Sequence, residues 1–387
     1  MAKLGEVCTI VSGSTPKTSV TSYWDGNIKW ITPAELNEDT FYIMDSVRHI
    51  TEEGKEKTGL SYLPTGTVIL SSRAPIGKTA IAGCKMCCNQ GFKNLICSDA
   101  IYNEYLYFFL KSKTDYLNSL GRGATFKEIS KSIVESIEIP LPEVKQQKEI
   151  AEKFKKLEQL ISLRKQQLAK LDELIKAQFV EMFGEISDNS MNWDYFTIGK
   201  LISTIESGWS GNGKQREKHA DEIAVLKVSA VTKGYFIPTE CKVLDDQHNI
   251  KKYVYPQKGD ILFSRANTKE MVGATVLIKK DYPDLILPDK LWKIRFCTDV
   301  NPIYMKHVLS TTTVRNAFSA ASTGTSGSMY NVSMEKFKGV IIPVPPLSVQ
   351  NKFAAFVERV DQQKQTVQQS LDKLELMKKA LMQEYFG

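Results

Sequence analysis

The chain has 387 residues, of which 42% are hydrophobic and 25% are charged, and these fractions are typical of a folded globular protein rather than a disordered one. Its 51 Lys and Arg residues outnumber its 44 Asp and Glu residues, so the net charge is +7, which is compatible with nucleic acid without requiring it. The sequence contains no apolar run of about 18 residues and no secretory signal, so neither a membrane span nor export is expected. We therefore expect a cytoplasmic protein, whose seven cysteines are reduced thiols.

The first block, residues 1–142, has the pattern of a mixed α/β domain. Short β-branched runs bounded by Gly, Pro and Asn predict strands at 68–71, 79–82 and 95–97, and a helix is expected at 103–120. A Gly-rich loop follows. There is no regular alternation of strands and helices, so a doubly wound parallel sheet is not expected.

Three motifs in this block are similar to chemical sites but favour structural interpretations. The run 72–79 is similar to a phosphate-binding P-loop, yet Ser72 occupies the place of the first glycine, so we predict a turn between strands. The Glu-Gly-Lys run at 53–55 has a nuclease-like spacing, and we interpret it as a solvated turn. The cysteines within 84–97 fit strand positions better than a zinc site, because they contain only one Cys-x-x-Cys.

Residues 143–184 predict one long helix. No Pro or Gly interrupts 143–183, good helix formers dominate, and Gly184 stands where a glycine commonly ends a helix. Apolar residues recur at alternating spacings of four and three, which is typical of a coiled-coil seam. The apolar seam residues are Ile150, Phe154, Leu157, Ile161, Leu168, Leu171, Ile175 and Met182.

The second block, residues 185–345, repeats the mixed pattern. Strands are predicted at 223–228, 260–263 and 274–278, and a helix is expected at 301–321 with Asn301 as its N-cap and Pro302 at its first position. The Asn-Pro-Ile-Tyr run that begins this helix is similar to a signature of amino-methyltransferases. It lacks the second Pro and an upstream Gly-rich cofactor loop, so methyl transfer by this chain itself is not expected.

Residues 346–387 repeat the long helix. At an offset of 203, residues 137–184 match 340–387 at 15 of 48 positions without a gap, and Gln147 faces Gln350. We expect the two helices to bury each other as an antiparallel intramolecular coiled coil. The alternative is two separate amphipathic helices, each packed on its own domain. The second seam consists of Phe353, Val357, Val360, Val367, Leu371, Leu374, Leu381 and Tyr385.

The predicted architecture is therefore α+β and pseudo-two-fold. Its blocks are 1–142, 143–184, 185–345 and 346–387: two mixed domains and two long helices. The second variable block holds most of the net charge, because residues 185–339 carry 21 basic and 17 acidic groups. No catalytic or metal-ligating constellation is predicted.

The duplicated Ile-Pro-x-Pro segments carry a family resemblance. Each is followed by Gln147 or Gln350 and a long helix, and these features resemble the specificity (S) subunits of type I restriction–modification systems. The run Gly-Ala-Thr-Phe-Lys-Glu-Ile-Ser at 123–130 and the block openings at 4–7 and 198–201 resemble them too. Two departures are the Ser-Val-Gln start at 348–350 and the run 324–332, which lacks the Thr-Phe-Lys-Glu pattern of the first copy.

The resemblance implies a non-catalytic subunit that binds double-stranded DNA. Each of two target-recognition domains would read one half of a bipartite site, and the helices would act as a ruler and as the docking surface for two methyltransferase (M) subunits. Those subunits would carry S-adenosylmethionine, while restriction (R) subunits would use ATP and Mg. No cofactor is expected on this chain.

Candidate DNA contacts are basic or polar residues at strand ends and in Gly-rich loops. Arg73 and Arg265 are interpreted as equivalent positions just after a strand, where a structural salt bridge is the alternative role. Arg to guanine and Asn or Gln to adenine are the commonest base pairings. The full set is Arg73, Lys78, Lys93, Arg122, Lys127, Trp209, Asn212, Lys214, Arg216, Arg265 and Lys290.

Two other functions stay open. The chain could be a fused single-chain restriction–modification enzyme, although no catalytic motif supports this. It could also be a coiled-coil scaffold whose globular blocks bind protein partners.

Overall fold

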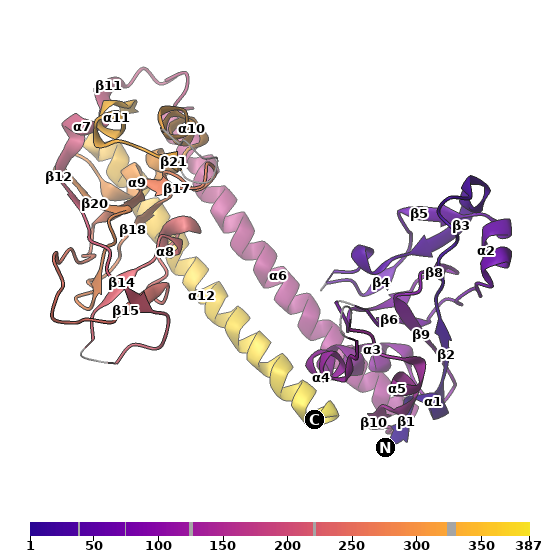
Figure 1. The fold of residues 1–387 in the computed structure, drawn as a ribbon. Helices are drawn as coiled ribbons and strands as arrows, with labels where there is room; N and C mark the ends of the chain where they lie inside the picture. The colour runs from indigo at the N-terminus through magenta and orange to yellow at the C-terminus, as the bar shows by residue number, and fades with distance from the viewer. Residues whose placement is uncertain (38, 74, 124–126, 220–221, 323–329) are drawn as a thin grey trace. The chain divides into compact units, whose positions relative to one another are not determined.

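The computed structural model describes residues 1–387 except 38, 74, 124–126, 220–221 and 323–329. The chain divides into two compact units. Figure 1 shows the fold, with colour running from the N-terminus to the C-terminus. Unit 1 contains Met1–Gln166 and Gln368–Gly387, and unit 2 contains Gln167–Val367. Each unit therefore combines one mixed α/β domain with a segment of both long helices.

Unit 1 contains a five-stranded sheet in the order β2-β9-β6-β7-β4, a three-stranded sheet in the order β5-β3-β8, and the pair β1-β10. The strands are β1 (Ala2–Lys3), β2 (Cys8–Ser12), β3 (Trp24–Ile31), β4 (Tyr42–Ile43), β5 (Arg48–Ile50), β6 (Val68–Ser71), β7 (Thr79–Ala82), β8 (Cys87–Cys88), β9 (Phe92–Cys97) and β10 (Glu138–Ile139). The domain helices are α1 (Leu4–Val7), α2 (Glu52–Thr58), α3 (Asn103–Ser112), α4 (Thr114–Leu120) and α5 (Lys131–Ser136), with short 3-10 turns at Thr21–Tyr23 and Pro33–Glu35.

The predicted elements of the first block are mostly present. Strands 68–71 and 79–82 are β6 and β7, joined by the predicted turn, and strand 95–97 is the end of the longer β9. The helix predicted at 103–120 is divided into α3 and α4 at Lys113, whose backbone leaves the helical region. The turn predicted at 53–55 is wrong: it lies inside α2, because the Thr51 hydroxyl caps the Gly54 N–H and Gly59, at φ 67°, ends the helix.

Unit 2 contains two four-stranded sheets, in the orders β12-β20-β16-β18 and β13-β15-β14-β19, and the pairs β11-β22 and β17-β21. The strands are β11 (Asp194–Thr197), β12 (Ile202–Ser207), β13 (Gly213–Lys214), β14 (Ala224–Leu226), β15 (Cys241–Leu244), β16 (Ile261–Ser264), β17 (Ala266–Asn267), β18 (Thr275–Leu277), β19 (Leu285–Ile286), β20 (Leu291–Phe296), β21 (Tyr330–Asn331) and β22 (Ile341–Val344). The domain helices are α7 (Ile198–Leu201), α8 (Ser229–Thr232), α9 (Pro302–Ser310), α10 (Thr312–Ala321) and α11 (Met334–Gly339).

The second block follows its predicted pattern with small shifts. Strands predicted at 223–228, 260–263 and 274–278 are β14, β16 and β18. Asn301 caps the following helix through the Ile303 N–H at 2.9 Å, and Pro302 is its first residue, as predicted. The helix predicted at 301–321 is divided into α9 and α10, because Thr311 adopts an extended backbone and caps α10.

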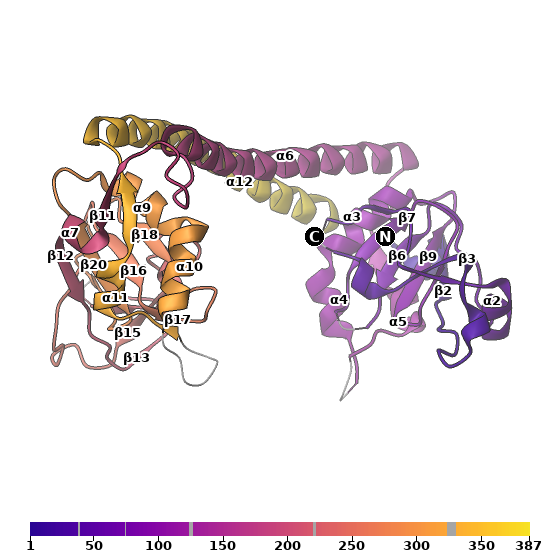
Figure 2. The ribbon, with the colours of Figure 1, turned by 90° about the horizontal axis from the view of Figure 1, so that it is seen from above.

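The two long helices are α6 (Val144–Phe183) and α12 (Leu347–Phe386), and Figure 2 shows both from above. In unit 1, the Lys153 ammonium contacts the Tyr385 hydroxyl at 3.0 Å, and the Lys378 ammonium contacts Glu158 at 2.8 Å. Residue numbers rise along one helix as they fall along the other, so the segments are antiparallel. Unit 2 has the same orientation, because Asp172 pairs with Lys364 while Phe179, later in α6, packs on Phe353, earlier in α12.

All 16 predicted seam residues are buried or partly buried. Three more large side chains were missed: Phe179 and Phe183 pack into the core of unit 2, and Phe386 packs into the core of unit 1. An α-helix of 3.6 residues per turn drifts from a strict 3.5-residue repeat, which moves the buried face by one position. The helices therefore bury each other and also pack their ends into the domain cores.

The repeat is visible in matching hydrogen bonds. Gln147 accepts from the Tyr102 N–H and donates to the Pro142 carbonyl, both at 2.8 Å. Gln350 makes the same two bonds, at 2.8 Å each, with the Asn301 N–H and the Pro345 carbonyl. Because both glutamines are fully buried, these bonds satisfy backbone groups that water cannot reach. The predicted fold class is confirmed: two mixed α/β domains and an antiparallel helix pair.

Candidate nucleic-acid interface

In the first domain, three segments meet at one end of the five-stranded sheet. They are the loop after β2, the turn before β9 and the residues after β6. The Ser14 N–H donates to the Cys88 carbonyl at 3.1 Å, and the Ser72 N–H donates to the Gly91 carbonyl at 2.7 Å. The Thr15 hydroxyl closes the arrangement with a hydrogen bond to the side-chain carbonyl of Gln90. We call this arrangement the strand-end junction.

The second domain has the same strand-end junction. The Trp209 N–H donates to the Leu287 carbonyl at 2.9 Å, and the Arg265 N–H donates to the Lys290 carbonyl at 3.1 Å. The Ser210 hydroxyl donates to the carboxylate of Asp289, which stands where Gln90 stands in the first domain. Both junctions follow a strand whose last residue is a serine followed by a glycine, at 12–13 and at 207–208. That repeated pair is the signal that could have located the junctions from the sequence.

These bonds correct the predicted equivalence of Arg73 and Arg265. Arg265 corresponds to Ser72, because each donates its N–H to the turn before the last strand, and each accepts from the residue that begins the next segment, Val332 or Ile129. Arg73 corresponds instead to Ala266, because each of these two residues pairs with the neighbouring segment, through Glu128 or Asn331. The sequence Ser-Arg-Ala occurs at 72–74 and at 264–266, and aligning these two runs requires a one-residue gap between the domains. The strand pairing has no such gap, because Ser71 and Ser264 occupy the same position. Since neighbouring residues of an extended chain point to opposite faces, the two arginines occupy different environments.

Glu128 holds together the basic residues of the first junction. Its carboxylate contacts Arg73 at 2.8 Å and Lys93 at 3.2 Å. Burial raises the pKa of this carboxyl, but hydrogen bonds and charge from Arg73 and Lys93 outweigh it, so the pKa of Glu128 is lowered. Lys93 is buried and Arg73 is 44% exposed, so Arg73 presents more of its side chain to solvent. Arg122 and Lys127 are exposed beside it.

Lys78 is engaged by main-chain carbonyls of its own domain. Its ammonium donates to the backbone carbonyls of Leu36 at 2.6 Å and Pro33 at 3.2 Å. A lysine that satisfies two main-chain carbonyls stabilises the segment around the Pro33–Glu35 turn. The DNA contact of Lys78 stays a prediction.

The predicted residues of the second domain divide by environment. Trp209 packs against the apolar cluster around Val225 and Ile286, so its ring supports the core. The Arg216 guanidinium donates two hydrogen bonds, of 2.6 and 2.8 Å, to the Glu222 carboxylate. These bonds, together with a hydrogen bond from the His219 N–H, lower the pKa of Glu222 to about 2. Arg216 is exposed, as are Asn212, whose main-chain carbonyl accepts from the Asp245 N–H, and Lys214 in β13. Lys290 is partly buried at the junction.

Arg265 is held at the second junction by Asp289. Its Nε donates to the Asp289 main-chain carbonyl at 2.9 Å, and its guanidinium lies 4.0 Å from the Asp289 carboxylate. About a third of its side chain is exposed, so part of the guanidinium can reach a ligand. The second junction therefore holds the Arg265 guanidinium, a cation, beside the Asp289 carboxylate, a hydrogen-bond acceptor.

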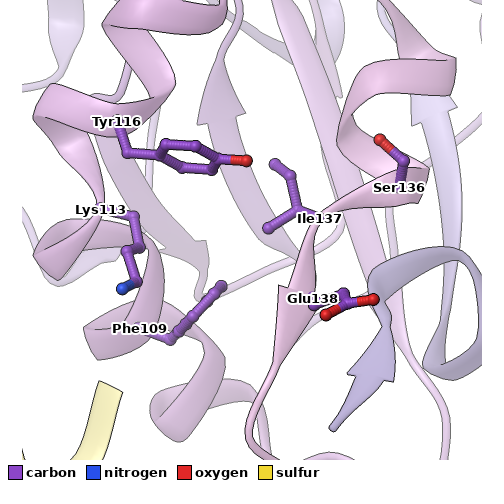
Figure 3. A pocket seen from close by; sticks show the side chains of 6 residues that line it. All are labelled: Phe109, Lys113, Tyr116, Ser136, Ile137 and Glu138. Atoms are coloured by element: carbon purple, nitrogen blue, oxygen red, sulfur yellow. The ribbon is translucent and has the colours of Figure 1, made fainter. Parts of the chain in front are cut away.

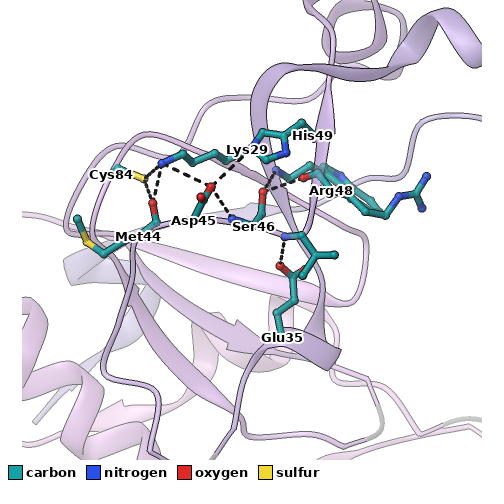
Figure 4. Close-up of polar contacts among 10 residues, drawn as sticks. Lys29, Glu35, Met44, Asp45, Ser46, Arg48, His49 and Cys84 are labelled. Atoms are coloured by element: carbon teal, nitrogen blue, oxygen red, sulfur yellow. Dashed lines mark hydrogen bonds and ion pairs between the residues drawn. The ribbon is translucent and has the colours of Figure 1, made fainter.

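One exposed cation that the sequence did not single out is Arg48, the first residue of β5, whose side chain Figure 4 shows projecting outward just after the loop that precedes the strand. Its guanidinium lies 3.6 Å from the centre of the Trp24 ring, a cation–π contact that fixes its direction while leaving it exposed. The loop is held by the Lys29 ammonium, which donates to the Met44 carbonyl at 2.6 Å, and by Glu35, which accepts from the Val47 N–H at 2.7 Å. No glycine-rich loop or repeat marks this arginine in the sequence.

The described residues include a surface pocket in unit 1, and their side chains and helices also bear on metal binding and membrane crossing. Figure 3 shows a surface pocket of about 390 Å³ in unit 1, where Phe109, Tyr116 and Ile137 supply apolar walls beside Lys113 and Glu138. No group of three His, Cys, Asp or Glu side chains is placed to hold a metal ion among the residues described. In the same residues, no helix combines the length and apolarity needed to cross a membrane.

Comparisons with known proteins agree with this duplicated architecture. A family model described as the type I restriction modification DNA specificity domain matches residues 1–173 and again 191–376. The specificity subunit of the type I restriction enzyme MjaIX from Methanocaldococcus jannaschii is 31% identical over 319 residues, which cover 72% of this chain and 73% of that one.

Two solved structures share the fold. The type I restriction–modification S subunit from M. genitalium aligns with a TM-score of 0.58 at 13% identity, covering all of this chain and 95% of that chain. A chain from a structural study of complex assembly and conformational transition of the type I R-M system aligns with a TM-score of 0.60 at 17% identity, covering all of this chain and 96% of that one. With two matched domains, a relative at 31% identity and a shared fold, this chain belongs to the family of type I restriction–modification DNA specificity subunits.

Proposed function

We propose that this chain binds a bipartite DNA site, with one half read by each domain, and docks two methyltransferase subunits through α6 and α12. The observation that carries the proposal is the duplicated strand-end junction: two domains of one chain present the same three segments, with different side chains. A shared framework with different exposed groups is what reading two different half-sites requires.

The charge distribution supports DNA binding. Arg73, Arg122 and Lys127 surround the first junction, and Arg265 lies at the second. Cationic side chains contact phosphates and position a protein on the duplex, while a few side chains that reach base edges give specificity. A net charge of +7 is modest for a DNA-binding protein, and partner subunits would add further phosphate contacts.

Exposed apolar residues on the long helices support subunit docking. In unit 1, Leu160 and Leu163 of α6 are 46% and 51% exposed, and Leu376 and Met377 of α12 are 68% and 54% exposed. The seam itself is buried, so these four side chains lie outside it and are open to a partner subunit. Contact with a methyltransferase subunit would remove their apolar area from water.

The chemistry would reside on the partners. S-adenosylmethionine would bind the methyltransferase subunits, and ATP and Mg would bind restriction subunits. The role of this chain is then to choose the DNA and to fix the distance between the half-sites through a stiff helix pair.

Copurification and DNA binding test the proposal. The full chain, expressed with a candidate methyltransferase, should copurify with it and bind specific DNA. Arg73→Ala and Arg265→Ala should each weaken that binding by about 1–3 kcal/mol if they reach bases. Lys57→Ala, which removes one exposed charge of α2, is the matched control and should change binding little. A chain that binds a protein partner but no DNA would support a scaffold instead.

A further inference from the structure

The two strand-end junctions differ at one corresponding position, where the first domain has Gln90 and the second has Asp289. We propose that these two residues each read one base pair: Gln90 reads adenine in the half-site of the first domain, and Asp289 reads cytosine in the other half-site. This inference rests on the proposed function and adds the residues and base identities to it.

Gln90 has the hydrogen-bonding groups that adenine recognition needs. The Thr15 hydroxyl donates to its Oε1, so the carboxamide of this exposed side chain is fixed at the loop. Oε1 keeps a second lone pair, and the Nε2 group keeps its two N–H donors. One acceptor beside one donor matches the N6 donor and N7 acceptor that adenine presents in the major groove.

The turn that carries Gln90 is also fixed. The Asn89 side chain accepts from the Gly91 N–H at 2.8 Å, and the Asn89 N–H donates to the Ile31 carbonyl at 3.0 Å. A side chain on such a turn loses little freedom when it binds, which favours its use as a reading group.

Asp289 presents acceptors alone. Its Oδ1 accepts from the Ser210 hydroxyl, and its main-chain carbonyl accepts from the Ser207 hydroxyl at 3.3 Å. The side chain is 48% exposed. An ionised carboxylate has no donor, so it pairs with the N4 amino group of cytosine and repels the O6 of guanine and the O4 of thymine.

Arg265 acts here as a positioning residue. Its Nε bond of 2.9 Å to the Asp289 carbonyl fixes the turn, and its positive charge, 4.0 Å from the carboxylate, offsets the repulsion between Asp289 and phosphates. In the first domain the neutral Gln90 needs no such partner, and Ser72 occupies the corresponding place.

The test exchanges amide and carboxylate with minimal change of shape. The full chain, or Gln90→Glu or Asp289→Asn, is expressed with the methyltransferase that copurifies with it, and the methylated motif is mapped on genomic DNA. Gln90→Glu should reduce methylation of the original motif by about 5- to 150-fold, because adenine is no longer preferred at one position of one half-site. The sequence required in the other half-site should stay unchanged and serves as an internal control. Asp289→Asn should act the same way on one cytosine of the other half-site.

Further variants separate reading from folding. Thr15→Val removes the hydroxyl that orients Gln90 and should weaken the preference for adenine at the same position that Gln90→Glu affects. Thr15→Ser keeps a hydroxyl and should keep that preference. If both exchanged variants keep the original motif, or lose methylation without preference for one position, the inference is wrong. If the unaltered chain directs no bipartite motif at all, the proposed function fails first and the inference with it.

Discussion

His307 provides a sharp test of how α9 packs on the long helices in unit 2. Its ring lies 5.2 Å from the Phe353 ring of α12 and 6.3 Å from the Phe179 ring of α6. Desolvation, with the nearby positive charges of Lys306 and Lys364, lowers the pKa of His307 from 6.5 to about 3. The structurally corresponding residue of the first domain is Phe108, which is fully buried against Phe154.

The shift fixes the sign of the pH dependence. The unfolded chain binds this proton near pH 6.5 and the folded chain only near pH 3, so stability is complete above pH 6.5 and is lost as the pH falls toward 3. At about 1.4 kcal/mol per pH unit, the loss from this residue at pH 5 is about 2 kcal/mol. His307→Phe, which introduces the residue of the first domain, should remove that loss.

The assay is urea unfolding at pH 7.5 and pH 5.0, followed by circular dichroism. The difference in unfolding free energy between the two pH values should be about 2 kcal/mol smaller for His307→Phe than for the unaltered chain. His248→Phe, at an exposed position, is the matched control and should leave the pH difference unchanged. Equal pH differences for the unaltered chain and His307→Phe would refute the packing described for α9.

Two further predictions concern the ends of the long helices and their domains. Phe386 is buried against Tyr105, Phe109 and Phe154, so Phe386→Ala should lower the unfolding free energy by about 3–5 kcal/mol, while Leu376→Ala, at a 68% exposed position, should change it by less than about 0.5 kcal/mol. If chemical denaturation shows that Phe386→Ala and Leu376→Ala lower the unfolding free energy by similar amounts, the burial of Phe386 is contradicted. Gln147→Leu should cost more than Gln350→Leu, because Gln147 also donates to the Ala100 carbonyl at 3.0 Å and each orphaned buried group costs about 1–3 kcal/mol. The reverse order of the two losses would show that these bonds do not set stability.

The sequence predicts the repeated parts of this molecule well. The helix seams follow from spacing, because a buried stripe on a helix needs apolar residues at fixed intervals. The strands 68–71 and 79–82 follow from short β-branched runs bounded by turn residues. The Asn301 cap follows from an Asn-Pro pair placed where a helix begins.

The predictions that were wrong or incomplete concern features that depend on tertiary contacts. The Glu-Gly-Lys run at 53–55 lies in a helix because Thr51 caps it, against the preference of Gly for turns. Phe183 belongs to the core of unit 2 through Tyr304 and Phe353, which the heptad pattern cannot show. The one-residue error at Arg265 arose because similar letters do not fix a register, whereas the backbone hydrogen bonds to the neighbouring strand do.

The most direct test of the central claim is a map of methylated bases in the genome with and without this chain. We expect a bipartite motif, with one adenine-containing half-site for each domain and a constant spacer, to be methylated only when the chain is present. A methylation pattern that is unchanged when the chain is removed would contradict it.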